Sequence, residues 1–183
     1  AQLSLGIPRV ARYSQSRQQI YVPRGGKYAT LISASRSNFG GDITIEGNQL
    51  PQGVTMHAPN MPANMSTMPV VFEAAADAPI AGGLMTFQGK HVDPATGIQG
   101  HFKNRADLVV AAPGQSLYVY KDVEQLAIAV VDELPYSLEI VQPKVPIVQS
   151  GEMALKVLIH RKEGFNEAIT LQFPFRPPGI GTR

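Results

Sequence analysis

Polar and apolar residues alternate in short runs along most of the chain, which is the pattern of β-strands with one buried face. The clearest run is Asp-Ile-Thr-Ile-Glu at residues 42–46, where Ile43 and Ile45 share one face and the polar side chains share the other. Turn-forming Gly, Pro, Asn and Asp residues separate such runs at intervals of about 8–12 residues, a spacing typical of β-sandwiches and barrels. The pattern therefore predicts an all-β fold.

Helical periodicity is weak throughout the sequence. Its best candidate covers residues 122–131, but this stretch ends in the β-branched pair Val130 and Val131 and has strand-like neighbours. We therefore interpret it as part of the β pattern. Strands are predicted at residues 3–5, 20–22, 27–36, 42–47, 69–74, 80–90, 102–111, 117–120 and 126–131, and again at 138–141 and 153–161.

The stretch at residues 39–54 occurs twice in the chain. Residues 165–180 match it without a gap at a constant offset of 126 (165 − 39): both begin with Phe, both have Ile-Thr at the fifth position, and both end in Pro-x-Gly followed by Val or Ile. Such self-similarity indicates repeated modules. We therefore predict a complete β-sandwich at residues 1–135 and the N-terminal half of a second one at residues 136–183.

The second copy contains only what the first copy has reached by Val54. About three strands with open edges and an uncovered apolar face are not expected to be stable alone. We therefore expect residues 138–183 to pair with strands of a protein partner or of further domains of the same polypeptide, or else to be loosely ordered. The terminal Arg183 also suits cleavage by a trypsin-like protease in an exposed loop.

Composition narrows the class of protein. The chain has 183 residues, with 16 Lys and Arg against 14 Asp and Glu, and the basic residues are scattered, so the sequence lacks the basic patch of a nucleic-acid-binding protein. No apolar run reaches the length of a membrane span. Because there is no cysteine, disulfides and thiol chemistry are excluded.

The N-terminal residue Ala1 is not followed by a charged and apolar leader, so we expect either a signal peptide that has been removed or an internal fragment. A chain that lacks cysteine and carries few charges fits an exported bacterial protein.

Turn motifs in both copies resemble those of a known family. The first copy has Leu-Pro-Gln-Gly-Val at residues 50–54 and Ala-Ala-Ala-Asp-Ala-Pro at residues 74–79, and the second copy has a Gly-Phe turn at residues 164–165. With these motifs the chain resembles the bacterial immunoglobulin-like repeats of large secreted or cell-surface multidomain proteins. It departs from them at Arg176, which stands where the family has Leu, and at residues 93–131, which exceed a compact repeat.

The resemblance implies tandem immunoglobulin-like β-sandwiches in an extracytoplasmic setting: periplasmic, cell-surface or secreted. It also implies spacing, adhesion or subunit docking, with no shared active site. Our prediction is therefore a non-catalytic structural or protein–protein interaction module of an exported bacterial protein. The alternative hypotheses are an accessory module of a secreted hydrolase and a glycan-binding domain.

One loop concentrates residues that could bind a soft metal. Thioether and imidazole groups are suitable ligands for Cu(I), whereas methionines in such loops more often fill irregular gaps in a core. We favour the second interpretation. The residues concerned are Met56, His57, Met61, Met65 and Met68.

Two further groups have candidate chemistry. His91, Asp93 and His101 would form a metal site or an acid/base pair if a hairpin brought them together, although their spacing matches no metal motif. Tyr118 and Tyr120 would form a binding platform if both faced solvent, whereas a half-buried cross-strand pair is the simpler interpretation.

His160 lies late in a predicted strand and is interpreted as an exposed strand residue. The sequence contains no recognisable nucleophile, phosphate-binding or zinc motif. We therefore assign no catalytic, cofactor-binding or metal site.

Overall fold

Alternating apolar residues fold the first part of the chain into facing layers of strands. The computed structural model describes residues 1–8, 19–110 and 117–181. In the strand Thr67–Ala74, Met68, Val70, Phe72 and Ala74 are buried while the residues between them are partly exposed. This one-sided burial is what the sequence pattern predicts.

The described residues form thirteen strands and one short 3-10 helix. They are β1 (Gln2–Gly6), β2 (Gln19–Pro23), β3 (Lys27–Ser37), β4 (Ile43–Asn48), β5 (Val54–His57), β6 (Thr67–Ala74), β7 (Gly82–His91), η1 (Pro94–Thr96), β8 (Gln99–Phe102), β9 (Asn104–Val110), β10 (Leu117–Val123), β11 (Leu126–Val131), β12 (Tyr136–Ile140) and β13 (Val157–Arg161).

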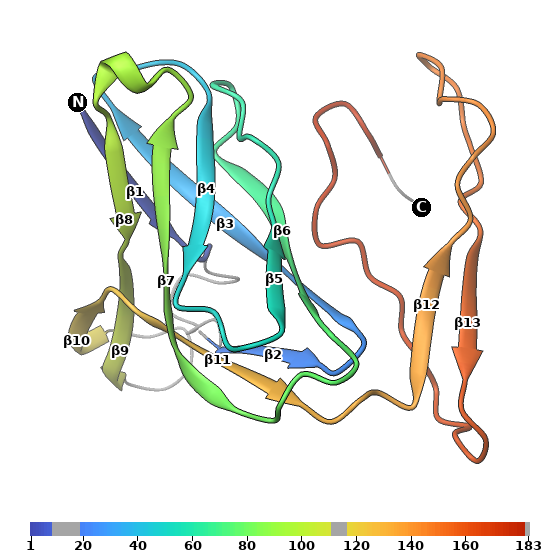
Figure 1. Cartoon of the computed structure of the whole chain (residues 1–183). Helices are drawn as coiled ribbons and strands as arrows, with labels where there is room; N and C mark the ends of the chain where they lie inside the picture. The colour runs from blue at the N-terminus through green and yellow to red at the C-terminus, as the bar shows by residue number, and fades with distance from the viewer. Residues whose placement is uncertain (9–18, 111–116, 182–183) are drawn as a thin grey trace.

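Nine of these strands form one continuous hydrogen-bonded sheet that folds over itself as a sandwich (Figure 1). The strand order is β2-β11-β7-β8-β1-β3-β6-β5, and β4 also pairs with β7. The long strand β7 joins the layers, because one end pairs with β11 and the other with β4 and β8. The predicted all-β sandwich is therefore confirmed.

The prediction of one strand at residues 102–111 is wrong in its extent. It is divided at Lys103 into β8 and β9, because β8 pairs with β7 and β1, whereas β9 pairs with β10 in a separate two-stranded sheet. Residues 122–131, the best helical candidate, contain the end of β10 and all of β11, as expected of a β stretch.

An aromatic row fills the centre of the sandwich. The rings of Phe72 and Phe87 have centroids 6.2 Å apart in an edge-to-face arrangement, and those of Phe87 and Phe102 are 5.7 Å apart. All three side chains are fully buried and come from β6, β7 and β8. Phe87 therefore ties together strands from both layers.

Residues 136–181 form no comparable core. Their only strands in the described part of the chain are β12 and β13, which pair antiparallel with each other and stand outside the sandwich (Figure 1). No described residue after Val131 is buried. The repeat predicts a strand near residues 169–174, matching β4, and this prediction is wrong, because the segment forms no strand. In the first copy, β4 is held by β7, and no strand plays that part here.

Two turns nevertheless have the same geometry in both copies of the repeat. The amide of Gly26 donates to the carbonyl oxygen of Pro23 at 3.0 Å, and residues 151 and 148 form the same bond at 3.0 Å. Gly53 and Gly179, which close the Pro-x-Gly turns, have φ values of +78° and +85°. The copies are thus alike in their local turns and differ in what surrounds them.

We expect Phe87→Ala to lower the free energy of unfolding by about 3–5 kcal/mol, because the truncation leaves a cavity between the layers. The matched control is Phe173→Ala, which removes a half-exposed ring and should change stability by less than about 0.5 kcal/mol. Urea unfolding monitored by circular dichroism measures both. Equal losses in the two variants would contradict the assigned core.

Candidate functional site

The paired strands β12 and β13 present one apolar face to solvent. Leu138 lies opposite Ile159, and Ile140 lies opposite Val157. Because residues directly opposite each other in an antiparallel pair share a face, these four side chains lie together, whereas Tyr136 and its opposite residue Arg161, at one end of this face, lie against the ring of Phe165. We call the four side chains the uncovered face. Three of its members, Leu138, Ile140 and Ile159, rank among the exposed large hydrophobic residues of the chain.

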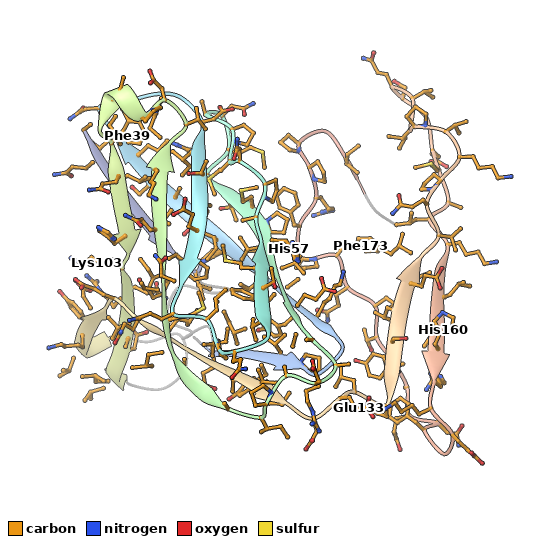
Figure 2. The ribbon with its side chains drawn as sticks, viewed as in Figure 1. Phe39, His57, Lys103, Glu133, His160 and Phe173 are labelled. Atoms are coloured by element: carbon orange, nitrogen blue, oxygen red, sulfur yellow. The ribbon has the colours of Figure 1, made fainter. Side chains whose placement is uncertain are left out.

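The opposite face of this strand pair is more polar. His160 lies opposite Ser137, and its Nε2 atom is 3.0 Å from a carboxylate oxygen of Glu139. Figure 2 shows His160 on the outer strand, β13. The histidine is exposed, as the sequence predicts. The pair therefore has a polar side suited to solvent and an apolar side that is not.

The uncovered face corresponds to a buried face in the first copy. At an offset of 125 residues, Ile159 in β13 corresponds to Ala34 in β3, and Arg161 corresponds to Arg36. In the first copy Leu5 lies opposite Ala34, so the position of Leu138 is that of Leu5. Leu5 is 1% exposed, whereas Leu138 is 49% exposed.

The offset is 125 in this strand and 126 after it because the connecting turn differs by one residue. Three steps lead from Arg36 to Phe39, and four lead from Arg161 to Phe165. The extra residue lies in the turn, so the offset stays at 125 up to Arg161 and at 126 from Phe165 onward. The equivalences on either side of the turn therefore hold.

Other core positions behave in the same way. Val22 is 0% exposed and its counterpart Ile147 (147 − 22 = 125) is 44% exposed. Each further pair sets a buried residue against an exposed one: Ile20 and Val145, Ile45 and Leu171, and Val54 and Ile180. Residues that make the core of the first copy thus have apolar counterparts in the second that reach solvent.

A hollow of about 770 Å³ lies among these exposed residues. Ile147, Met153, Leu155 and Phe173 supply its apolar lining. Figure 2 shows Phe173 on the segment that follows β13. The hollow, which Glu152 also lines, and the uncovered face together are the candidate functional site, and both expose apolar side chains.

The start of the strand pair is fixed to the linker that precedes it. The Lys162 ammonium forms an ion pair and hydrogen bond with Glu133, and the Lys162 amide donates to the carbonyl oxygen of Pro135 at 2.9 Å. The hydrogen bond from Lys162 is the main reason that the pKa of Glu133 is lowered. This contact holds β13 close to residues 132–135.

The methionine loop belongs to the core of the first copy. Met61 is fully buried and exchanges two backbone hydrogen bonds with Ile43, of 2.8 and 3.0 Å, while Met68 is buried on β6. Met65 packs against the core, as does Met56. His57 lies 3.2 Å from a carboxylate oxygen of Glu73. The arrangement agrees with the gap-filling interpretation.

Arg36 holds this loop in place, a role for which the sequence carries no signal. Its guanidinium donates to the carbonyl oxygens of Met65 at 2.6 Å and of Met61 and Pro62 at 3.2 Å each. Burial lowers the pKa of Arg36, and the nearby Asp42 carboxylate partly offsets this effect. The equivalent Arg161 donates instead to an exposed carbonyl oxygen, that of Glu167.

We expect Arg36→Ala to lower the free energy of unfolding by about 2–3 kcal/mol, because three carbonyl groups lose a charged donor. Arg161→Ala is the matched control at the equivalent position, and its effect should stay below about 0.5 kcal/mol. Thermal and urea unfolding of both variants would measure the difference. A neutral Arg36→Ala variant would refute the anchoring role.

His91, Asp93 and His101 do not converge on one point. His101 lies opposite Gln88 on β7, three residues from His91 along the strand. The His91 ring contacts backbone atoms instead: Nε2 is 3.0 Å from the carbonyl oxygen of Gly40, and Nδ1 accepts from the amide of Asp93 at 3.0 Å. Its role is therefore to join two turns.

We expect Gly41→Ala to destabilise the sandwich by about 1–3 kcal/mol, because Gly41 has a φ of +100° and an added Cβ atom would lie 2.2 Å from Nε2 of His91. A Cβ atom at the neighbouring Gly40 meets nothing within 4 Å, so Gly40→Ala is the control and should be near neutral. Chemical denaturation would compare the two. Similar stabilities would contradict the close approach of His91 to this turn.

Tyr120 is half-exposed, and the guanidinium of Arg105 lies 3.7 Å above its ring centroid. Arg105 also lies near Asp122, which Lys103 approaches to 3.3 Å. The ring is thus covered on one side by a cation. The side chain of Tyr118 lies outside the described residues, so the proposed tyrosine pair stays a prediction.

Within the described ranges, no three His, Cys, Asp or Glu side chains are grouped so that they could hold a metal ion. The same ranges contain no helix long and apolar enough to cross a membrane. Comparisons of the chain with protein-family models, with curated proteins and with solved structures find no match. The uncovered face and the hollow are therefore the surfaces that bear on function.

Proposed function

We propose that this chain is a structural and interaction module whose second copy docks onto further polypeptide. The observation that carries the proposal is the exposure of apolar residues at core positions of the repeat, such as Leu138 and Ile147. Exposed apolar surface of this kind marks interaction sites in natural proteins. The polar reverse side, with the His160–Glu139 contact, favours burial of one face only.

The module consists of tandem immunoglobulin-like sandwiches, a complete one at residues 1–135 and half of a second at residues 136–183. The recurring turn hydrogen bond at Gly26 and Gly151 supports this organisation. So does the antiparallel pairing of β12 with β13, which resembles that of β1 with β3.

The setting is extracytoplasmic and bacterial, with a role in spacing, adhesion or subunit docking. Its support is the resemblance of the turn motifs to bacterial immunoglobulin-like repeats and the lack of cysteine. A non-catalytic role follows from the same resemblance. The chemistry assigned to the site, apolar contact along strands, requires no reactive group.

Hydrogen exchange on the whole chain tests the exposed half-module. We expect the amides of β3, β6 and β7 to exchange at least roughly a hundredfold more slowly than those of β12 and β13, because the former lie over a buried core. The measurement is made at a concentration where sedimentation shows a monomer. Equal protection of both regions in the monomer would contradict the proposal.

A further inference from the structure

We propose that residues 152–158 pair with an antiparallel strand of a partner, in the way that residues 27–33 pair with β6. This β6-type strand carries a basic residue opposite Glu152 and an acidic residue opposite Lys156. This inference rests on the proposed function and specifies the partner's chemistry. The occupant is an extended segment with apolar residues at alternate positions, as in β6, rather than a second copy of this chain. Addition of such a strand to a free sheet edge is a common mode of peptide recognition.

The two halves of β3 depend on different neighbours. β3 is eleven residues long. Residues 33–37 pair with β1, whereas residues 27–33 pair with β6. The first half is therefore held in the sheet by β6.

The second copy has lost the corresponding half of this strand. Subtracting the offset of 125 places residues 152–158 at 27–33 and residues 158–162 at 33–37. All of β13 (Val157–Arg161) pairs with β12, and its residues 158–161 correspond to the half of β3 that pairs with β1. Residues 151–156 form no strand. The part that lacks regular structure is thus the part whose counterpart requires β6. No strand of the described chain lies along this edge.

The charges along this edge indicate what the partner strand carries. In the first copy Lys27 lies opposite Glu73 of β6, and the two charges are 3.3 Å apart. The counterpart of Lys27 is Glu152, so the charge is reversed and a basic partner residue is favoured. The counterpart of Leu31, which faces Pro69, is Lys156, and it favours an acidic partner residue.

A β6-type strand also explains how the uncovered face becomes covered. In the first copy β6 leads into β7, and β7 passes so close to Leu3 and Leu5 that a Cβ atom at Gly89 would lie 3.0 Å from Leu3. Leu138 occupies the position of Leu5. A partner that supplies both strands would therefore bury it, whereas pairing between two half-modules would add no second layer.

The test uses the full chain and two fluorescent peptides of residues 66–75. The complementary peptide carries Pro69→Glu and Glu73→Lys, and the control peptide carries Pro69→Lys and keeps Glu73, so the two have the same charged residue types in opposite order. We expect the complementary peptide to bind about threefold to tenfold more tightly by anisotropy. Hydrogen exchange should show new protection at residues 152–158. In a chain with both Glu152→Lys and Lys156→Glu, the preference should reverse.

Ile159→Asp and Leu158→Asp separate the two faces of β13. The first places a charge on the uncovered face and should weaken peptide binding at least about fivefold; the second lies on the polar side and should weaken it less. Equal affinity for both peptides, absence of binding, or protection confined to residues 1–131 would overturn the inference. So would a homodimer that protects residues 152–158 without peptide. If residues 136–181 are protected in the peptide-free monomer, the proposed function itself fails.

Discussion

The structure depends on one constraint: a sheet with one apolar face must have that face covered. Residues 1–131 meet it, because β7 carries Phe87 between the layers and pairs with strands on both sides. Residues 136–181 have the same kind of face and no second layer. The difference between the two parts lies in the covering strands rather than in the residues that need cover.

This contrast connects the fold to the proposed role. The turns at Gly26 and Gly151 form the same hydrogen bond, so the local chain direction is set by the sequence in both copies. The tertiary environment then decides whether a strand forms. Residues 27–33 are a strand beside β6, and residues 151–156, which largely correspond to them, are not a strand in the absence of such a neighbour. A segment of this kind is suited to ordering on contact with a partner.

Much of the fold could be predicted from alternation alone. Ile43 and Ile45 are buried as expected, and the all-β sandwich follows from the spacing of strands and turns. The parallel pairing of β1 with β8 could not be predicted, because contacts between distant strands depend on packing. The hydrogen bonds from Arg36 to three carbonyl oxygens likewise have no sequence signal, since they depend on the path of a loop. The uncovered face could be predicted from the repeat.

The most direct test of the account is a comparison of urea unfolding between the full chain and a chain of residues 1–135. No described residue after Val131 is buried. Unfolding of the full chain should therefore expose little more surface than unfolding of residues 1–135. Both chains should thus have the same midpoint and the same m value, since m scales with the surface exposed on unfolding. A lower midpoint or a clearly smaller m value for the shorter chain would show that residues 136–183 are packed, and would contradict the account.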